Sequence, residues 1–209
     1  MIVERMPVGV YAANCYIVYN EDTKNGVIID PGGDGKEIVE RINQLGVNVK
    51  YIILTHGHGD HIGGVLDVKR AFNAPVLIHE LDVEYLSDPE KNLSSMMPMN
   101  EIEIEPDLRL KGGDVFKLDN YDIEIIHTPG HTKGGISIKI GDNLFTGDTL
   151  FAGSIGRTDF EGGSYSDIIS SINDKLIKYP DETIVYPGHG PSSSIGREKS
   201  YNQFIINWE

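Results

Sequence analysis

Residues 54–64 read LTHGHGDHIGG and decide the fold, because they place four side chains that can bind a metal within six residues. The stretch follows a short apolar run, YIIL at 51–54, which predicts a buried strand. Residues two apart in an extended chain point to the same side, so the first two histidines can share one ion. Imidazole together with carboxylate suits zinc, iron or manganese. The four side chains are His56, His58, Asp60 and His61.

Asp60 and His61 fall where the chain must bend into a helix expected over 61–72, so they can turn toward a second metal position. The glycines at 57, 59, 63 and 64 let the backbone fold tightly around an ion. A polar loop with coincidental histidines is the alternative. A cluster of this density is a specific signal, however, and favours a metal site.

Three glycine-rich turns later in the chain each carry one potential ligand directly after a predicted strand. A rigid scaffold presents functional side chains at such positions. The turns are TPGHT at 128–132 with His131, TGDT at 146–149 with Asp148, and YPGHGP at 186–191 with His189.

The composition is that of a globular protein, with 39% hydrophobic and 24% charged residues in a chain of 209. We expect a single domain over 1–209. The net charge of −14 argues against nucleic acid and against anionic membranes as partners. Cys15 is the only cysteine, which excludes an intramolecular disulfide. The N-terminus lacks the apolar run of a signal peptide, and no stretch approaches 18 apolar residues, so a cytoplasmic location is expected.

Short β-rich runs alternate with a few helices along the chain. Two β-rich halves, each with helices to cover one face of a sheet, are therefore predicted. Strands are expected at 14–19, 26–30, 51–54, 75–78, 115–118, 121–127, 136–140, 143–146 and 183–186. Helices are expected from an Asp34 cap to a Gly46 stop, over 61–72, over 164–178 with Ser164 as cap, and after Ser194, where Phe204, Ile205 and Trp208 would be buried.

An acidic surface excursion is expected at about 80–112. Residues 80–107 hold nine acidic side chains and one basic one, so this stretch carries eight of the fourteen net negative charges. It also carries an apolar tip at 96–99, MMPM. A solvated acidic connection is favoured over a substrate lid.

The ligand motifs resemble those of the metallo-β-lactamase superfamily. The matching elements are THGHGDHIGG at 55–64, PGHT at 129–132, FTGDTL at 145–150 and PGHG at 187–190, in that family's order. The glyoxalase II group is the most similar part of that superfamily, through GDTLFAGSIGRTDF at 147–160 and GHGPSSSIGREK at 188–199. The resemblance implies an α+β fold, a four-layer αββα sandwich of two mixed β-sheets flanked by helices. It also implies a cleft for metals at one edge of the two sheets.

Carried over position by position, the resemblance implies two metal sites. His56, His58 and His131 would hold the first ion, and Asp60, His61 and His189 the second, with Asp148 bridging both. Two zinc ions per chain are expected, with iron or manganese as alternatives. Asp60 would also orient the nucleophile.

The resemblance further implies a metal-dependent hydrolase of thioesters of the hydroxyacylglutathione type, acting by attack of a metal-bridging hydroxide on the carbonyl. The glyoxalase II C-terminal helical extension is not expected here, because about 20 residues follow His189. The expected partner is a small anionic thioester, bound by a monomer or homodimer. Candidate substrate contacts are Lys133, Arg157 and Tyr165, although an ion pair of Arg157 with Asp159 is the stronger expectation for that arginine.

Several alternatives stay open. A mononuclear iron persulfide dioxygenase would need only His56, His131 and Asp148, and a hydrolase of another ester or lactone would use the same site. A β-lactamase is less favoured, because its second site differs at the position of Asp148, and an RNA-processing nuclease needs a basic surface. A non-catalytic binding protein would lack ligands, and none is missing. His79 and His127 are expected to be structural, and Asp30 is expected either to orient a ligand or, more simply, to stabilise a turn.

Overall fold

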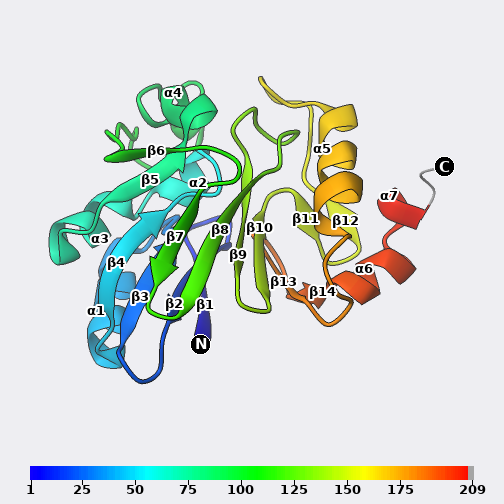
Figure 1. Cartoon of the computed structure of the whole chain (residues 1–209). Helices are drawn as coiled ribbons and strands as arrows, with labels where there is room; N and C mark the ends of the chain where they lie inside the picture. The colour runs from blue at the N-terminus through cyan, green and yellow to red at the C-terminus, as the bar shows by residue number, and fades with distance from the viewer. Residues whose placement is uncertain (207–209) are drawn as a thin grey trace. The chain divides into compact units, whose positions relative to one another are not determined.

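The computed structural model describes residues 1–206 and divides into two compact units (Figure 1). The first unit comprises Met1–Leu110 and Lys117–Asn120, and the second comprises Lys111–Phe116 and the chain from Tyr121 onward. Each unit is built on a six-stranded mixed sheet with helices packed on it. The predicted α+β class, two mixed β-sheets flanked by helices, is therefore confirmed.

The sheet of the first unit has the order β1-β2-β3-β4-β5-β6. Its strands β1, β2 and β3 are antiparallel neighbours, whereas β3 to β6 run parallel. The predicted pair at 14–19 and 26–30 is the hairpin of β2 and β3. The strands are β1 (Ile2–Val8), β2 (Ala13–Tyr19), β3 (Asn25–Ile29), β4 (Asn48–Ile53), β5 (Val76–His79) and β6 (Leu108–Leu110).

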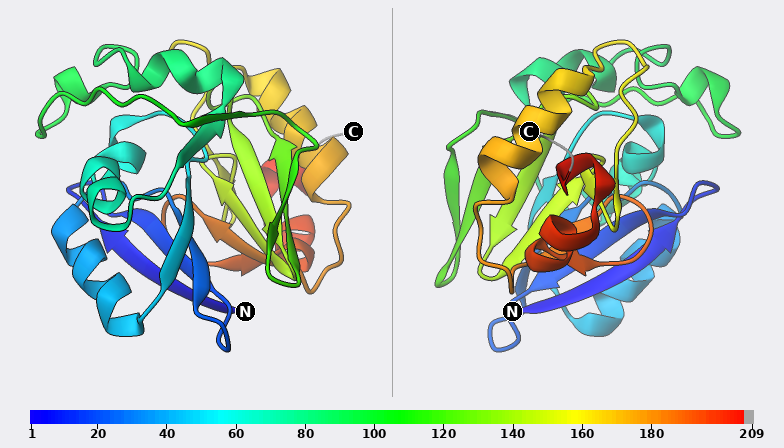
Figure 2. Two further views of the ribbon diagram at one scale, coloured as in Figure 1. Left: turned by 60° about the vertical axis from the view of Figure 1, so that its left-hand side comes forward. Right: turned by 90° about the vertical axis from the view of Figure 1, so that its right-hand side faces the viewer.

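Helices α1 and α3 lie side by side on one face of this sheet (Figure 2). Ile38 and Ile42 of α1 are fully buried there against strand residues such as Ile17. This apolar stripe at helical spacing forms the core of the unit. The helices are α1 (Gly35–Leu45), α2 (Gly59–Ile62), α3 (Val65–Phe72), the short 3-10 helices η1 (Glu80–Asp82) and η2 (Ser94–Met96), and α4 (Val83–Leu86).

Two helix predictions in this unit need correction. Asp34 precedes α1, but its side chain does not cap the helix; it accepts the backbone N–H of Gly9 at 2.8 Å instead. The helix expected over 61–72 is two helices, α2 and α3, interrupted at Gly63 and Gly64. A side chain at Gly63 would meet the carbonyl oxygen of Gly32 at 2.5 Å, so the close approach of two loops requires glycine at the interruption.

The second unit is built around the sheet β14-β13-β10-β9-β8-β7. In it β10 and β13 are parallel, whereas the pairs β13–β14, β9–β10 and β8–β9 are antiparallel. Helices α5, η3 and α6 bury Ile168, Ile172 and Ile195, respectively, against β10 and β13. The strands are β7 (Val115–Leu118), β8 (Tyr121–His127), β9 (Ile136–Ile140), β10 (Asn143–Gly147), β11 (Leu150–Phe151), β12 (Ser154–Ile155), β13 (Ile184–Pro187) and β14 (Ser193–Ser194). The helices are α5 (Tyr165–Ser171), the π-helix η3 (Ile172–Leu176), α6 (Ile195–Tyr201) and α7 (Gln203–Ile206).

Both predicted N-caps of this unit are confirmed, since the hydroxyls of Ser164 and Ser194 accept N–H groups three residues on, at 3.3 Å. The last helix is shorter than expected, because α6 ends before Asn202 and α7 follows. Ile205 is buried as predicted, whereas Phe204 is 38% exposed. Trp208 lies outside the described residues.

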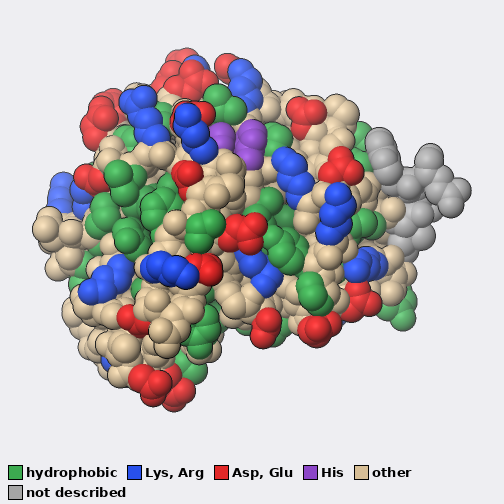
Figure 3. Space-filling view, in the orientation of Figure 1, with side chains coloured by type: hydrophobic (Ala, Val, Ile, Leu, Met, Phe, Trp, Pro, Cys, Tyr) green, Lys and Arg blue, Asp and Glu red, His purple; other side chains and the backbone are tan. Residues whose placement is uncertain are grey.

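The segment expected as a solvated acidic connection belongs to the first unit as far as Leu110, and it forms the short elements η1, α4, η2 and β6 between turns. Seven of its nine acidic side chains are exposed, as expected for a surface, but Asp82 is completely buried, as are Asn92 and Leu86. On the face drawn in Figure 3, basic and acidic side chains are interspersed. Over residues 1–206, no helix has the length and apolarity needed to cross a lipid bilayer.

Candidate metal centre

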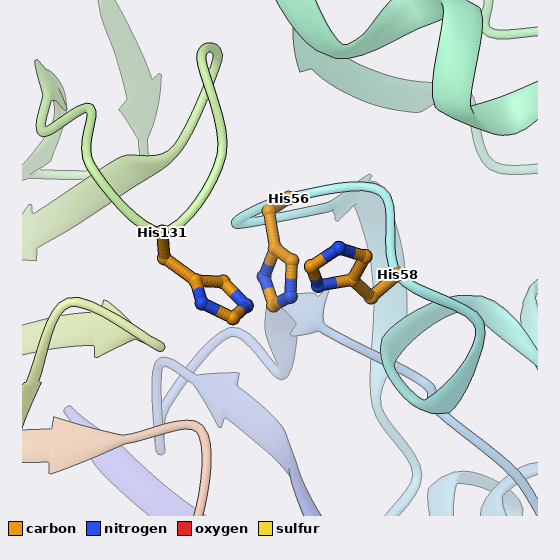
Figure 4. A group of neighbouring side chains, drawn as sticks. All are labelled: His56, His58 and His131. Atoms are coloured by element: carbon orange, nitrogen blue, oxygen red, sulfur yellow. The ribbon is translucent and has the colours of Figure 1, made fainter. Parts of the chain in front are cut away.

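The loop between β4 and α2 in the first unit carries the four clustered ligand candidates. His56 is 2% exposed and His58 is 3% exposed. Their rings meet edge to face, with centroids 4.8 Å apart (Figure 4). The backbone of His58 is extended, and a ring nitrogen of His58 lies within 4.8 Å of one of His56, as their spacing predicts. Figure 4 also draws His131, which belongs to the second unit and is described with it.

Asp60 and His61 lie in helix α2, the single helical turn that follows His58. His61 is fully buried, and its ring centroid lies 4.2 Å from that of His56. Its Nε2 atom lies 3.9 Å from Oδ2 of Asp60. A Cβ at Gly32 would collide with the Asp60 carbonyl oxygen at 1.7 Å, so only glycine there lets the Asp30 loop pack against α2.

Asp30 orients ligands and is not a simple turn residue. It follows β3 in a left-handed conformation with φ of +49° and is 1% exposed. Its carboxylate accepts the N–H of Thr55 at 2.7 Å, the hydroxyl of Thr55 at 2.5 Å and Nδ1 of His61 at 3.0 Å. Asp30, His56 and His61 offer ligand atoms within 4.8 Å of one another. These three accepted bonds make Asp30 a support for the histidines.

The same bonds determine which ring nitrogen of two histidines can bind a metal. His61 donates Nδ1–H to Asp30, so its Nε2 carries the lone pair. The single hydroxyl proton of Thr55 goes to Asp30, so Thr55 must accept at its 3.1 Å contact with Nδ1 of His56. His56 therefore also holds its lone pair on Nε2. A carboxylate that fixes histidine tautomers in this way is typical of metal sites.

In the second unit the three predicted ligands converge on one another from three loops. Nε2 of His131, after β8, lies 3.7 Å from Oδ2 of Asp148, after β10. Nε2 of His189, after β13, lies 3.7 Å from the same oxygen. Nδ1 of His131 contacts the carbonyl oxygen of Arg157 at 2.8 Å, which can only accept, so Nε2 of His131 carries the lone pair.

These distances fit ligands arranged around metal ions. A separation of 3.7 Å is too long for a hydrogen bond, whereas two ligands at 2.1 Å from one tetrahedral zinc lie about 3.4 Å apart. One carboxylate oxygen equally distant from two imidazoles suits a bridging ligand. Buried imidazole nitrogens with fixed lone pairs, together with carboxylates, form a donor set for a divalent transition metal.

The candidate substrate contacts all lie in the second unit. Arg157 forms a two-pronged ion pair with Asp159, at 2.7 and 2.8 Å, and its guanidinium lies 3.6 Å from the centre of the Phe160 ring. This bond holds the pKa of Asp159 down at about 2. Lys133 is exposed, and the Tyr165 side chain is half exposed. Arg157 contributes to the centre through its backbone carbonyl.

The two remaining histidines form local structural bonds. Nδ1 of His79 accepts the N–H of Leu81 at 3.3 Å and caps η1, while Nε2 of His127 donates to the carbonyl of Lys133 at 2.9 Å. Sequence reasoning missed Thr55, which links Asp30 to His56. Its position directly before His56, in THGHGDH, was the available signal.

Two mixed sheets with histidines and aspartates at strand ends define a metallo-hydrolase scaffold. A family model described as the metallo-beta-lactamase superfamily matches residues 8–189, and the chain belongs to that superfamily. It is thus an enzyme of the metallo-hydrolase type with a divalent-metal site.

Named relatives cover nearly the whole chain. The hydroxyacylglutathione hydrolase GloC of Haemophilus influenzae is 38% identical over 209 residues, which is 98% of each protein. The crystal structure of the BLEG-1 B3 metallo-beta-lactamase superposes with a TM-score of 0.94 at 36% identity, covering 99% of this chain and 100% of that one. TTHA1623 in a di-iron-bound form gives a TM-score of 0.85 at 31% identity, covering 97% and 100%.

Proposed function

We propose that the chain hydrolyses thioesters of the hydroxyacylglutathione type with two divalent metal ions per chain. The first ion is assigned to His56, His58 and His131. The second would be held by Asp60, His61 and His189, and Asp148 is proposed as a ligand common to both. The observation that carries the two-ion assignment is the position of Asp148, whose Oδ2 lies 3.7 Å from two imidazole nitrogens.

The thioester assignment is supported by the likeness to GloC over 98% of both chains. The relative solved in a di-iron-bound form makes iron a candidate beside zinc. Both metals suit the imidazole and carboxylate donors of these loops.

The chain's own residues hold and orient the reacting groups. When bound, two such ions supply a water of lowered pKa and a Lewis acid for the carbonyl. Asp30 and Thr55 keep Nε2 of His61 and His56 as lone-pair donors, and the Arg157 carbonyl does the same for His131. Asp60 is proposed to accept a hydrogen bond from the nucleophile, which orients it toward the carbonyl carbon.

Metal counting combined with a substrate panel tests this proposal. The purified chain is analysed for zinc, iron and manganese by mass spectrometry and assayed with lactoylglutathione, other thioesters, lactones and a persulfide under an oxygen electrode. We expect two ions per chain and preferential thioester hydrolysis. His131→Ala should lose an ion and most activity. His127→Ala, which changes a histidine at the end of β8 outside the proposed ligand set, should keep both ions and the activity.

One iron per chain, with oxygen consumed on the persulfide and no thioesterase activity, would sink the hydrolase proposal. If the chain prefers a lactone, the proposed metal site stands and the proposed thioester substrate is wrong.

A further inference from the structure

The two glycines that flank His58, Gly57 and Gly59, both donate their backbone N–H groups to the acidic segment 80–104. The N–H of Gly57 donates to Oδ2 of Asp82 at 3.3 Å, and the N–H of Gly59 donates to the backbone carbonyl of Asn92 at 2.7 Å. The backbone of His58 is therefore held on both sides by residues outside its own loop.

The two anchors are themselves immobilised, since Asp82 and Asn92 are completely buried. The Asn92 amide donates to the carbonyl oxygens of Tyr85 and Ile102, both at 2.9 Å, and its side-chain oxygen accepts the N–H of Ser94 at 2.9 Å. Asn92 thus links Tyr85 of helix α4 to Ser94 and to Ile102, which lie further along the same segment. Without the Asn92 side chain, three buried backbone groups would each lose a hydrogen-bond partner.

Tyr85, from the same segment, packs against the loop that carries His58. The Tyr85 ring lies edge-on to the His58 ring, with centroids 5.7 Å apart. A Cβ at Gly57 would meet Cβ of Tyr85 at 2.4 Å. The glycine at 57 is therefore required by close packing against this segment, in addition to any need of the loop to bend.

We propose that segment 80–104 is a positioning element for His58, with Asp82 and Asn92 as its positioning residues. The inference rests on the metal site of the proposed function and not on its substrate. A ligand histidine binds well only when its ring is held in place, and loss of outer partners costs about 10- to 100-fold in metal affinity. The excursion would thus adjust the affinity of the first metal site.

The test compares two matched buried asparagines. Asn202 is also completely buried, and its amide donates to Ser154 and Glu198 while its oxygen accepts the N–H of Phe204, far along the chain in the second unit. Asn92→Ala and Asn202→Ala are titrated with zinc in competition with a chromophoric chelator. Their cobalt-substituted forms are compared by visible absorption, and thermal unfolding of the metal-free proteins is recorded.

We expect Asn92→Ala to weaken one of the two zinc constants by about 10- to 100-fold and to shift the cobalt bands, while Asn202→Ala changes neither. Equal zinc constants and spectra in both variants would overturn the inference. A wild-type chain that binds no divalent ion would instead refute the metal site and this inference with it.

A second pair of variants decides the matter if Asn92→Ala does not fold. Asp82→Asn keeps an acceptor oxygen for the Gly57 N–H, and Asp82→Ala removes it. The inference requires weakened zinc binding in Asp82→Ala and recovery toward the wild-type constant in Asp82→Asn. Equal binding by these two variants and the wild type would contradict it.

Discussion

Replacing Asp30 by asparagine should separate metal affinity from folding. Asparagine tolerates the left-handed backbone at this position, where φ is +49°, so the substitution tests the carboxylate and not the turn. If the amide oxygen keeps the Thr55 N–H, the amide nitrogen faces Nδ1 of His61 and the Thr55 hydroxyl. Both groups must then accept. His61 and, through Thr55, His56 move their protons from Nδ1 to Nε2.

This reversal of the hydrogen bonds around residue 30 sets the expected losses of stability and of zinc affinity. Because hydrogen bonds to a charged group are replaced by neutral ones, the free energy of unfolding of the metal-free protein should fall by about 1–3 kcal/mol. Metal binding should suffer more, because two ligand nitrogens lose their lone pairs. We expect at least a roughly 100-fold loss of zinc affinity, about 2.8 kcal/mol at 1.4 kcal/mol per tenfold.

Zinc competition with a chromophoric chelator gives the affinity, and urea unfolding in excess chelator gives the stability. Asp34→Asn is the matched control, since Asp34 also has a left-handed backbone, with φ of +48°, and its carboxylate accepts the Gly9 N–H, far from the histidines in sequence. Zinc affinity of Asp30→Asn within twofold of the wild type, or an equal loss in Asp34→Asn, would refute the reasoning.

Three further outcomes are expected. Arg157→Ala should change kcat/KM by less than about threefold and the free energy of unfolding by less than about 0.5 kcal/mol. The reason is that, among the described residues, the exposed Arg157 side chain contacts Asp159 and the Phe160 ring. A large rise in KM in steady-state assays would instead make the side chain a substrate contact. Gly156→Ala should lower the Tm by about 6–12 °C, because its Cβ would lie 1.7 Å from the Asp148 carbonyl oxygen, and an unchanged calorimetric Tm would contradict this packing. Burial raises the pKa of the Cys15 thiol, so above pH 9.0 the thiol ionises in the unfolded chain but not in the folded one, and stability falls as pH rises. Urea unfolding at about pH 8 to 10.5 should show the wild type losing about 1.4 kcal/mol of unfolding free energy per pH unit relative to Cys15→Ala. The same pH dependence of the unfolding free energy in both proteins would exclude this cause.

Local patterns were enough to predict the elements that carry their own signals. Helix α1 follows from apolar spacing and its stop at Gly46, whose φ of +67° closes the helix as expected. The ligand loops follow from histidines and aspartates placed between glycines after apolar runs. The hairpin of β2 and β3 follows from two β-rich runs around a polar turn.

Features that depend on distant partners could not be read from local patterns. Asp34 looks like a helix cap, but the N–H of Gly9 binds its carboxylate from 25 residues away. The need for glycine at position 63, between α2 and α3, depends on the approach of the Gly32 carbonyl. The burial of Asn92 among acidic neighbours depends on carbonyl groups at positions 85 and 102. Only the folded chain brings these groups together.

The border strands of the first sheet have a consequence for association between copies of the chain. Strand β1 ends the sheet on one side and carries Glu4, Arg5 and Pro7, while β6 ends it on the other with only three residues. Proline cannot donate to a further strand, and charged side chains make a new pairing costly. Glu4 is also ion-paired with Arg41 of α1. The sequence of β1 is thereby a poor template for intermolecular strand addition, which lowers the tendency of the chain to aggregate through this strand.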